Sequence, residues 1–260
     1  MYAELDAARS NWRYQPPADL LAGRTILVTG AGDGIGRCAA RTFAAHRANV
    51  VLLGRSQRKL EAVFDVIRSE TDTDPTIVPC DLEVATVEAY ADLNDQIVDH
   101  YGRLDGLLHN ASLLGPRVPI EFYDAASWRR VMQVNVEAMF LLTQGVLAAL
   151  RRSSDASVVI TSSSVGRTGR AYWGAYAASK FAAEGFAQVL ADELADEGRV
   201  RVTTLNPGAT RTTMRTTAYP GEDPMTVPPP EARMDLYLFL LGPHARGRPE
   251  IQWDARDWTP

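Results

Sequence analysis

Short apolar runs alternate along this chain with segments that carry apolar residues at helical spacing. RTILVTG (24–30) and NVVLLG (49–54) have the near-continuous apolar character of strands that are buried on both faces. Residues 34–46 and 176–196 show helical spacing instead. Alternation of this kind predicts an α/β fold, in which a doubly wound parallel sheet of about seven strands carries helices on both faces.

No linker divides the chain, and its composition suits one core. A chain of 260 residues, 46% of them hydrophobic and 23% charged, can bury a large core without disulfides. We therefore predict a single domain over residues 20–260, with a polar N-terminal extension, residues 1–19, before it. The segment near 210–230, whose part from 219 to 230 is rich in proline, is expected to be a substrate loop of that domain.

Charge and hydropathy limit the partners of the protein. A formal net charge of -5 argues against a nucleic-acid or anionic-membrane surface. No window approaches the roughly 18 uninterrupted apolar residues of a membrane span, and the N-terminal segment lacks the apolar core of a signal peptide. We expect a cytoplasmic protein with small-molecule partners, no nucleic acid and no membrane. Cys38, Cys80 and the scattered histidines show no ligand spacing, so we predict no metal site.

The segment TGAGDGIG (29–36) joins the first predicted strand to the first predicted helix. Glycines in such a turn let backbone N–H groups and the helix dipole face a diphosphate. Polar residues follow the other apolar runs as well, at the edge where parallel sheets bind ligands. The turn therefore favours a dinucleotide site, and a turn whose glycines serve packing alone is the alternative.

The end of the second predicted strand bears on the choice of dinucleotide. An acidic side chain at this place is usual for NAD, whereas an arginine pairs with the 2'-phosphate of NADP. VVLLGRSQRK (50–59) contains no acid and places Arg55 directly after Gly54. The sequence therefore favours NADP(H) over NAD(H), although Asp33 in the glycine turn counts against it. The alternative is that Arg55 is a solvated loop residue, and Lys59 is interpreted as a solvated helix residue.

Tyr176 and Lys180 stand out because the chain has 27 basic residues and only two of them, Lys59 and Lys180, are lysines. A spacing of four places Tyr176 and Lys180 on one face of a helix, one turn apart. An adjacent ammonium favours the phenolate and would lower the pKa of the tyrosine toward the range useful for proton transfer. Tyr172 precedes the expected helix start near Gly174, so it should not share this geometry.

Three serines, 162–164, follow the strand that precedes this helix. Strand alternation places Thr161 and Ser163 on one face of the sheet and Ser162 on the other. The residues alone do not decide which serine acts with Tyr176.

Six motifs occur together in one order: TGAGDGIG, HNAS (109–112), QVNVEAMF around Asn135, TSSS (161–164), the pair Tyr176 and Lys180, and NPGATRT (206–212). In this order and spacing they resemble the short-chain dehydrogenase/reductase superfamily over residues 20–255. GRLDGLLHNASLLG and GAYAASKFAAEGFAQVLADE are similar to the bacterial YciK-type oxidoreductases of that superfamily. The resemblance implies a Rossmann-type fold and an enzyme that acts on CH–OH or carbonyl groups with NAD(P)(H).

The resemblance also implies a catalytic tetrad of Asn135, Ser163, Tyr176 and Lys180. Tyr176 would be the general acid in reduction and the base in oxidation, and Ser163 would stabilise the charge that develops on the substrate oxygen. Lys180 would bind the nicotinamide ribose and lower the Tyr176 pKa. Asn135 would hold a water that links Lys180 to solvent; a capping or kink residue within its helix is the alternative.

The glycine turn and the resemblance together assign a set of residues to cofactor binding. Asp81 resembles the family's adenine contact, Asn110 and Ala111 its segment along the cofactor, and the loop after Asn206 its nicotinamide contact. The full set is Gly30, Gly32, Asp33, Gly34, Ile35, Gly36, Arg55, Asp81, Leu82, Asn110, Ala111, Tyr176, Lys180, Pro207, Gly208, Thr210 and Thr212.

Two residues depart from the family pattern. His109 replaces an asparagine, which would alter how adjacent strands are tied together. Ser112 replaces a glycine, which would strain the backbone if that position requires a positive φ.

The main hypothesis is an NADP(H)-dependent enzyme that transfers hydride between nicotinamide and a ketone or secondary alcohol. The rival is a cofactor-binding sensor or interaction protein with little turnover. An epimerase or dehydratase relative would carry a longer C-terminal substrate domain, and an enoyl reductase would space its tyrosine and lysine more widely.

The substrate is not readable from the sequence. Its pocket is expected between residues 113–119, 165–173 and 214–230. Arginines near these segments would select an anionic substrate or else belong to a solvated surface: Arg167, Arg170, Arg211 and Arg215. Small residues after Tyr176, such as Ala178 and Ala182, resemble the family's subunit-contact helix and predict a homodimer or homotetramer.

Overall fold

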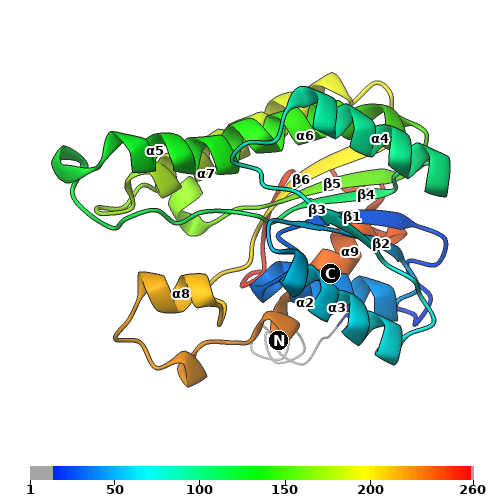
Figure 1. Ribbon diagram of the computed structural model, residues 1–260, viewed down its shortest axis with the longest axis horizontal. Coiled ribbons are helices and arrows are strands. Elements are labelled where there is room, and N and C mark those ends of the chain that lie inside the picture. The colour runs from blue at the N-terminus through cyan, green and yellow to red at the C-terminus, as the bar shows by residue number, and fades with distance from the viewer. Residues whose placement is uncertain (1–13, 259–260) are drawn as a thin grey trace, which may run out of the picture.

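One sheet of seven parallel strands organises the protein, of which the computed structural model describes residues 14–258 (Figure 1). The strand order is β3-β2-β1-β4-β5-β6-β7, so the sheet grows outward in two directions from the β1–β4 pair. Ligands bind at such a switch point, at the carboxyl ends of the strands. The predicted fold class is confirmed, with strands β1 (Thr25–Thr29), β2 (Asn49–Gly54), β3 (Thr76–Pro79), β4 (Gly106–His109), β5 (Ala156–Thr161), β6 (Val200–Asn206) and β7 (Gln252–Asp254).

Helices cover both faces of the sheet, as Figure 1 shows. One layer contains α2 (Gly34–Ala45), α3 (Gln57–Glu70) and α9 (Met234–Leu241). The other contains α4 (Val87–Tyr101), α5 (Ala125–Met132), the π-helical turn η2 (Gln133–Glu137), α6 (Ala138–Arg151) and α7 (Gly174–Glu193). The short helix α8 (Thr213–Ala218) stands apart from these layers, beyond the strand ends. Single 3-10 turns complete the chain: η1 (Ile120–Phe122), η3 (Ser164–Gly166), η4 (Pro224–Thr226), η5 (Pro230–Arg233) and η6 (Pro243–Ala245).

Burial on both faces explains why the central strands are largely apolar. In β1, Ile26 and Val28 belong to the core cluster under α2, α3 and α9, whereas Leu27 belongs to the cluster under α4, α6 and α7. Successive side chains of a strand point to opposite faces, so a strand between two helical layers needs apolar residues at every position. The two cores on either side of the sheet thus account for the sequence pattern.

Helices α3 and α4 begin at polar caps, Ser56 and Thr86. Ser56 accepts a hydrogen bond from Lys59 N at 3.4 Å before α3, and Thr86 accepts one from Ala89 N at 3.3 Å before α4. Such caps satisfy backbone donors that have no partner within the helix. α4 then ends at Gly102, whose φ of 78° is the left-handed conformation that glycine adopts readily.

One helical stretch among residues 14–258, Ala125–Arg151, is long and apolar enough to cross a membrane by length and composition alone. Its apolar stripe faces the core of the protein, where Leu142, Val146 and Leu150 pack against β5 and α4. A helix with an apolar stripe at this spacing is typical of a sheet-covering layer.

The described part of the N-terminal extension contacts the body of the protein. The Tyr14 hydroxyl lies 2.7 Å from His244 Nδ1, and the Tyr14 ring packs edge-on against Phe239 and Trp258. Residues 1–13 of the predicted extension and the last two residues of the predicted domain lie outside the described residues. The division at residue 20 stays a prediction.

Candidate active site

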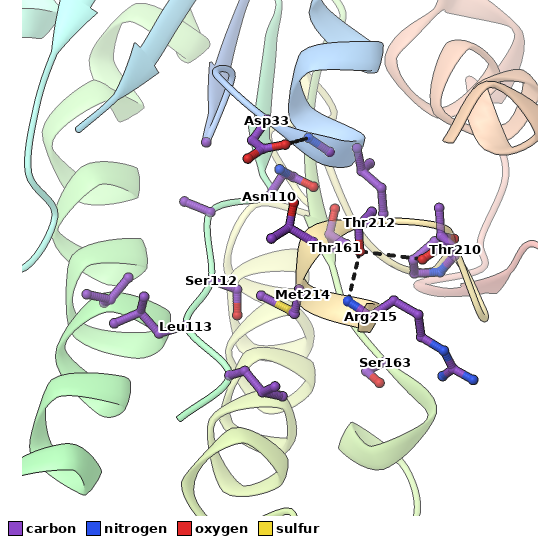
Figure 2. Close-up of a pocket in the computed structure, with 18 of the residues that line it drawn as sticks. Asp33, Asn110, Ser112, Leu113, Thr161, Ser163, Thr210, Thr212, Met214 and Arg215 are labelled. Atoms are coloured by element: carbon purple, nitrogen blue, oxygen red, sulfur yellow. Dashed lines mark hydrogen bonds between the residues drawn. The ribbon is translucent and has the colours of Figure 1, made fainter. Parts of the chain in front are cut away.

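A cavity of about 540 Å³ lies at the carboxyl ends of the strands (Figure 2). It collects residues from the turns after β1, β2, β3, β4, β5 and β6, which is the edge that the sequence analysis singled out. Two predicted site residues, Gly36 and Asn135, do not line it. The predicted residues that do are Gly30, Gly32, Asp33, Gly34, Ile35, Arg55, Asp81, Leu82, Asn110, Ala111, Ser163, Tyr176, Lys180, Pro207, Gly208, Thr210 and Thr212.

The glycine turn brings the N-terminus of α2 to the cavity. Gly30 has a φ of 66° and Gly34 a φ of 51°, a backbone region that other residues adopt only at a cost. Gly36 acts differently, because a Cβ there would lie 2.3 Å from the Gly30 carbonyl oxygen and 2.6 Å from Asn110 Nδ2. Gly36 therefore allows α2 to pack closely on β1. The turn fits a diphosphate, since its glycine backbone and the N-terminus of α2 line the cavity, together with the side chains of Asp33 and Ile35.

The acid in the glycine turn is compensated within the protein. The Asp33 carboxylate accepts a hydrogen bond from Gly34 N at 2.7 Å and lies 2.6 Å from Lys59 Nζ. This pairing with Lys59 holds the pKa of Asp33 below its usual value. Lys59 is an exposed residue of α3, as interpreted from the sequence, and it also lines the cavity beside Arg55. Because Lys59 neutralises the Asp33 carboxylate, the positive charge of Arg55 at this end of the cavity is not cancelled by Asp33.

The four predicted catalytic residues come from three neighbouring elements. Ser163 directly follows β5, Tyr176 and Lys180 lie one turn apart on α7, and Asn135 lies in η2. Tyr176 and Lys180 are buried, with exposed fractions of 8% and 5%. Lys180 Nζ donates a hydrogen bond to the Thr161 carbonyl at 2.8 Å and lies 5.5 Å from the centroid of the Tyr176 ring.

The candidate serines and tyrosines differ in what their side chains contact in the structure. The Ser163 hydroxyl is hydrogen-bonded to Tyr176. The Ser162 hydroxyl instead donates to Glu184 Oε1 at 2.5 Å. Tyr172 is 56% exposed and lies outside the cavity wall. Ser163 and Tyr176 are therefore the serine and tyrosine whose hydroxyls lie together, and this choice was open on the residues alone.

Burial dominates the protonation of the tyrosine and the lysine. It raises the pKa of Tyr176 to about 12, and the hydrogen bond with Ser163 offsets only part of this effect. Burial also lowers the pKa of Lys180 to about 8, against the attraction of Glu184. The expectation that Lys180 lowers the Tyr176 pKa was wrong for this structure, because the ammonium is directed at the Thr161 carbonyl and desolvation of the phenolate is the larger effect. Tyr176 is a neutral phenol at pH 7, which is the form that donates a proton.

From the π-helical turn η2, Asn135 makes hydrogen bonds to the loop at Leu113 and to α7. Its Oδ1 accepts from Leu113 N at 2.7 Å, and its Nδ2 donates to the Leu113 carbonyl at 2.9 Å and to Ser179 Oγ at 3.0 Å. A second cavity of about 10 Å³ is lined by Asn135, Lys180, Thr161 and His109 among others. This space is close to the size needed for one water molecule.

The two departures from the family pattern have structural accounts. His109 is buried, its Nε2 lies 2.8 Å from Thr143 Oγ1, and burial with the nearby Lys180 charge lowers its pKa to about 3. The tie between β1 and β4 is made instead by Thr29, whose hydroxyl donates to the Leu108 carbonyl and accepts from Asn110 N. Ser112 does not have a positive φ, so the expected strain is absent.

Of the arginines suggested for substrate selection, Arg215 alone lines the cavity within the described chain. Arg167 is committed elsewhere: its Nε donates to Glu184 Oε1 at 3.0 Å and its guanidinium to the Trp253 carbonyl at 3.0 Å. Arg211 donates to Met225 Sδ, and Arg170 is exposed. The hypothesis of an anionic substrate held by several arginines therefore has little support.

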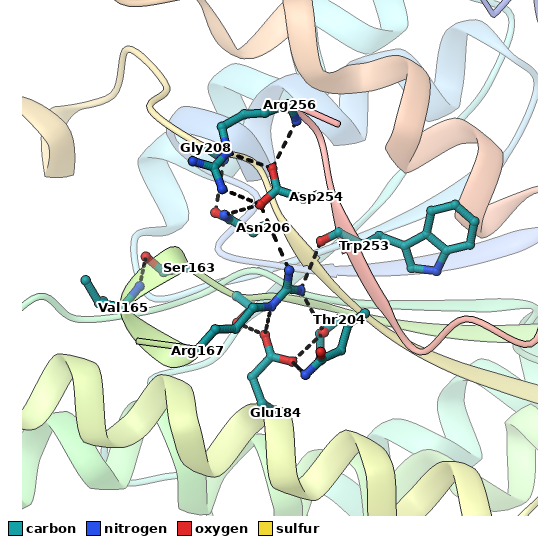
Figure 3. Close-up of polar contacts among 12 residues, drawn as sticks. Ser163, Val165, Arg167, Glu184, Thr204, Asn206, Gly208, Trp253, Asp254 and Arg256 are labelled. Carbon is teal, nitrogen blue, oxygen red and sulfur yellow. Dashed lines mark hydrogen bonds and ion pairs between the residues drawn. The ribbon is translucent and has the colours of Figure 1, made fainter. Parts of the chain in front are cut away.

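Sequence reasoning missed Glu184, a buried carboxylate one turn after Lys180 on α7 (Figure 3). Besides Ser162 and Arg167, its oxygens accept from Thr204 Oγ1 and from Gln252 Nε2, both at 2.8 Å. An acid four residues after the lysine on the same helix face was the signal that could have found it. The contacts continue through Asp254 and Asn206 to Gly208 N, in the loop that lines the cavity.

Within residues 14–258, no group of three or more histidine, cysteine, aspartate or glutamate side chains is placed to hold a metal ion.

Comparison with known proteins gives the family. A family model described as short chain dehydrogenase matches residues 24–223, and the chain belongs to this family. The chain is 51% identical over 243 residues to the oxidoreductase YciK of Escherichia coli K12. The aligned residues cover 94% of this chain and 96% of that protein. The resemblance found in the motifs is thus confirmed, and the protein is an oxidoreductase with the Rossmann fold.

Two further relatives are informative. A short chain dehydrogenase from Escherichia coli CFT073, solved in complex with NADPH, is 52% identical, with a TM-score of 0.90 over 93% of this chain and 100% of that one. A 2,5-dichloro-2,5-cyclohexadiene-1,4-diol dehydrogenase from Sphingobium indicum is 31% identical over 92% of this chain and 90% of its own length.

The lowered pKa of Lys180 predicts a pH dependence of stability. Unfolding returns this pKa from about 8 to 10.5, so between these values the unfolded chain binds more protons and stability rises with pH. Relative to Lys180→Met, the wild-type free energy of unfolding should increase by up to about 3 kcal/mol from pH 7 to pH 10.5. Urea unfolding of both proteins across this range measures the difference, and parallel pH profiles would contradict the assignment.

Proposed function

We propose that the protein is an NADP(H)-dependent oxidoreductase that interconverts a ketone and a secondary alcohol, with Tyr176 as the general acid and base. The observation that carries the proposal is the grouping of Tyr176, Ser163 and Lys180 at the wall of the cavity. A phenol with a neighbouring hydroxyl suits a carbonyl oxygen that gains charge and then a proton. When bound, the reduced nicotinamide supplies hydride to the carbonyl carbon.

Each residue of the site has a role in this proposal. The Tyr176 hydroxyl donates a proton to the substrate oxygen in reduction and removes it in oxidation. Ser163 Oγ donates a hydrogen bond to the same oxygen, which stabilises its developing charge. Lys180 supplies positive charge behind the phenol and binds the ribose hydroxyls. Asn135 holds the loop at Leu113 in place and lines the space for one water beside Lys180.

The proposed cofactor is NADP(H) rather than NAD(H). Arg55 lines the cavity at the end of β2, where an arginine suits a 2'-phosphate. The nearby carboxylate of Asp33 is paired with Lys59, so it leaves little negative charge to oppose a phosphate. The complex of a relative with NADPH supports the same choice. The diphosphate would lie on the turn from Gly30 to Gly36.

We also propose a homodimer or homotetramer in the cytoplasm, without nucleic-acid or membrane partners. The outer surface of α6 and α7 supports the oligomer, because Phe140, Phe181 and Val189 are 43%, 46% and 58% exposed on these helices. Exposed apolar side chains grouped on neighbouring helices are typical of subunit contacts.

Replacement of Tyr176 by phenylalanine removes the proton donor and keeps the ring. With NADPH and a panel of ketones, Tyr176→Phe should lower kcat by about 10² to 10⁴-fold, a far larger effect than any change in NADPH affinity from loss of one hydroxyl. Tyr172→Phe, at an exposed position outside the cavity wall, is the matched control and should keep full activity. Turnover that survives Tyr176→Phe contradicts the mechanism, and NADPH binding by the wild type without turnover on a broad panel favours a sensor.

Arg55→Ala tests the choice of cofactor. Loss of a charge-assisted contact with the 2'-phosphate should weaken NADPH binding by roughly tenfold or more and leave NADH binding unchanged. Arg58→Ala, at an exposed position of α3 outside the cavity wall, is the control. Fluorescence titration with both nucleotides gives the ratio of affinities, and an unchanged ratio in Arg55→Ala would show that the assignment is wrong.

A further inference from the structure

The part of the cavity around the Tyr176 hydroxyl has an apolar and aromatic wall. We refer to it as the substrate end, lined by Leu114, Trp173, Met214, Ala218 and Tyr219. The Trp173 ring centroid lies 5.7 Å from that of Tyr176 and 6.0 Å from that of Tyr219, so three rings follow one another along the wall. Rings in this arrangement offer apolar surface to a flat ligand of ring size.

Charge at the substrate end is already neutralised. Among the described lining residues there, Arg215 is the one charged side chain apart from Lys180. Its Nε and guanidinium Nη2 each donate to a carboxylate oxygen of Glu222 at 2.6 Å, in a two-pronged pair. Figure 2 shows the Arg215 side chain extending away from Met214 and Ser112. A substrate carboxylate would have to displace Glu222 to reach this guanidinium.

Arg215 and a second arginine brace the aromatic wall. The Arg215 guanidinium carbon lies 3.7 Å from the centroid of the Tyr219 ring. Arg117 does not line the cavity; its guanidinium carbon lies 4.6 Å from the Trp173 centroid and 4.9 Å from that of Tyr219, and it donates a hydrogen bond to the Ala218 carbonyl. Both arginines therefore contact ring faces, which holds α8 and its following residues against Trp173.

From these contacts we infer that the substrate is an uncharged ketone or alcohol with an apolar body of about ring size, and that Glu222 sets this specificity by occupying Arg215. The inference rests on the proposed function, because it takes the Tyr176 hydroxyl as the place of the reacting oxygen. An anionic substrate loses hydration at an apolar wall where Arg215 is paired with Glu222 and Lys180 donates to the Thr161 carbonyl, whereas a neutral substrate loses little hydration. Removal of the Glu222 charge frees Arg215 for a carboxylate.

A matched pair of ligands tests the inference: methyl 4-oxocyclohexanecarboxylate and the corresponding free carboxylate, which have the same ring and ketone. Calorimetry on the enzyme saturated with NADP⁺ measures both dissociation constants, with no turnover required. We expect the wild type to bind the ester at least about tenfold more tightly than the acid. Glu222→Gln should reduce this ratio by at least about fivefold through tighter binding of the acid.

Two variants make the outcome specific. Glu70→Gln breaks another Arg–Glu pair, with Arg41, away from the cavity wall, and should leave the ratio unchanged. In Glu222→Gln, the further change Arg215→Met should restore the wild-type ratio. Equal or tighter binding of the acid by the wild type, no binding of the ester, or an unchanged ratio in Glu222→Gln each overturns the inference. Failure of the proposed reaction is separate, because it appears as turnover that survives Tyr176→Phe.

Discussion

The buried ammonium group of Lys180 determines which polar groups must surround it at the carboxyl ends of the strands. A charged lysine that is only 5% exposed has lost most of its hydration, and the protein must supply partners for it. The Thr161 carbonyl at the end of β5 accepts its hydrogen bond, and the Glu184 carboxylate lies one turn further along α7. The positions of β5 and α7 relative to each other are thereby coupled to the charge at the site.

Glu184 in turn needs its own donors, and these come from elements that are distant in the chain. Ser162 after β5, Arg167 after η3, Thr204 in β6 and Gln252 in β7 all donate to it. A buried carboxylate without such donors would carry a large desolvation cost. Strand β7 therefore helps to hold α7 in place, and through Asp254 and Asn206 it also contacts the loop at Gly208. His109 is buried close to Lys180. Burial and the Lys180 charge both lower its pKa, so the imidazole stays neutral.

The sequence predicted the features that depend on local pattern. Central strands buried on both faces are largely apolar, so these strands were predictable from the sequence, and helical spacing was enough to pair Tyr176 with Lys180. The choice of Ser163 over Ser162 needed the family resemblance, because alternation gives the face of a residue but not what covers that face. The pairing of Lys59 with Asp33 and that of Arg167 with Glu184 were missed, because the partners lie 17 or more residues apart and only the folded chain brings them together. The Tyr176 pKa was misjudged since burial, which the sequence does not give, outweighs a neighbouring charge.

The charge on Lys180 can be measured directly, because the chain contains only two lysines. Selective ¹³C labelling of lysine side chains gives one NMR signal for each of them, and Lys180→Met assigns the signal of interest. Burial against the Thr161 carbonyl predicts that the Lys180 signal titrates with a pKa of about 8 in the folded protein. A Lys180 signal that remains protonated through pH 10 would contradict this account of the site.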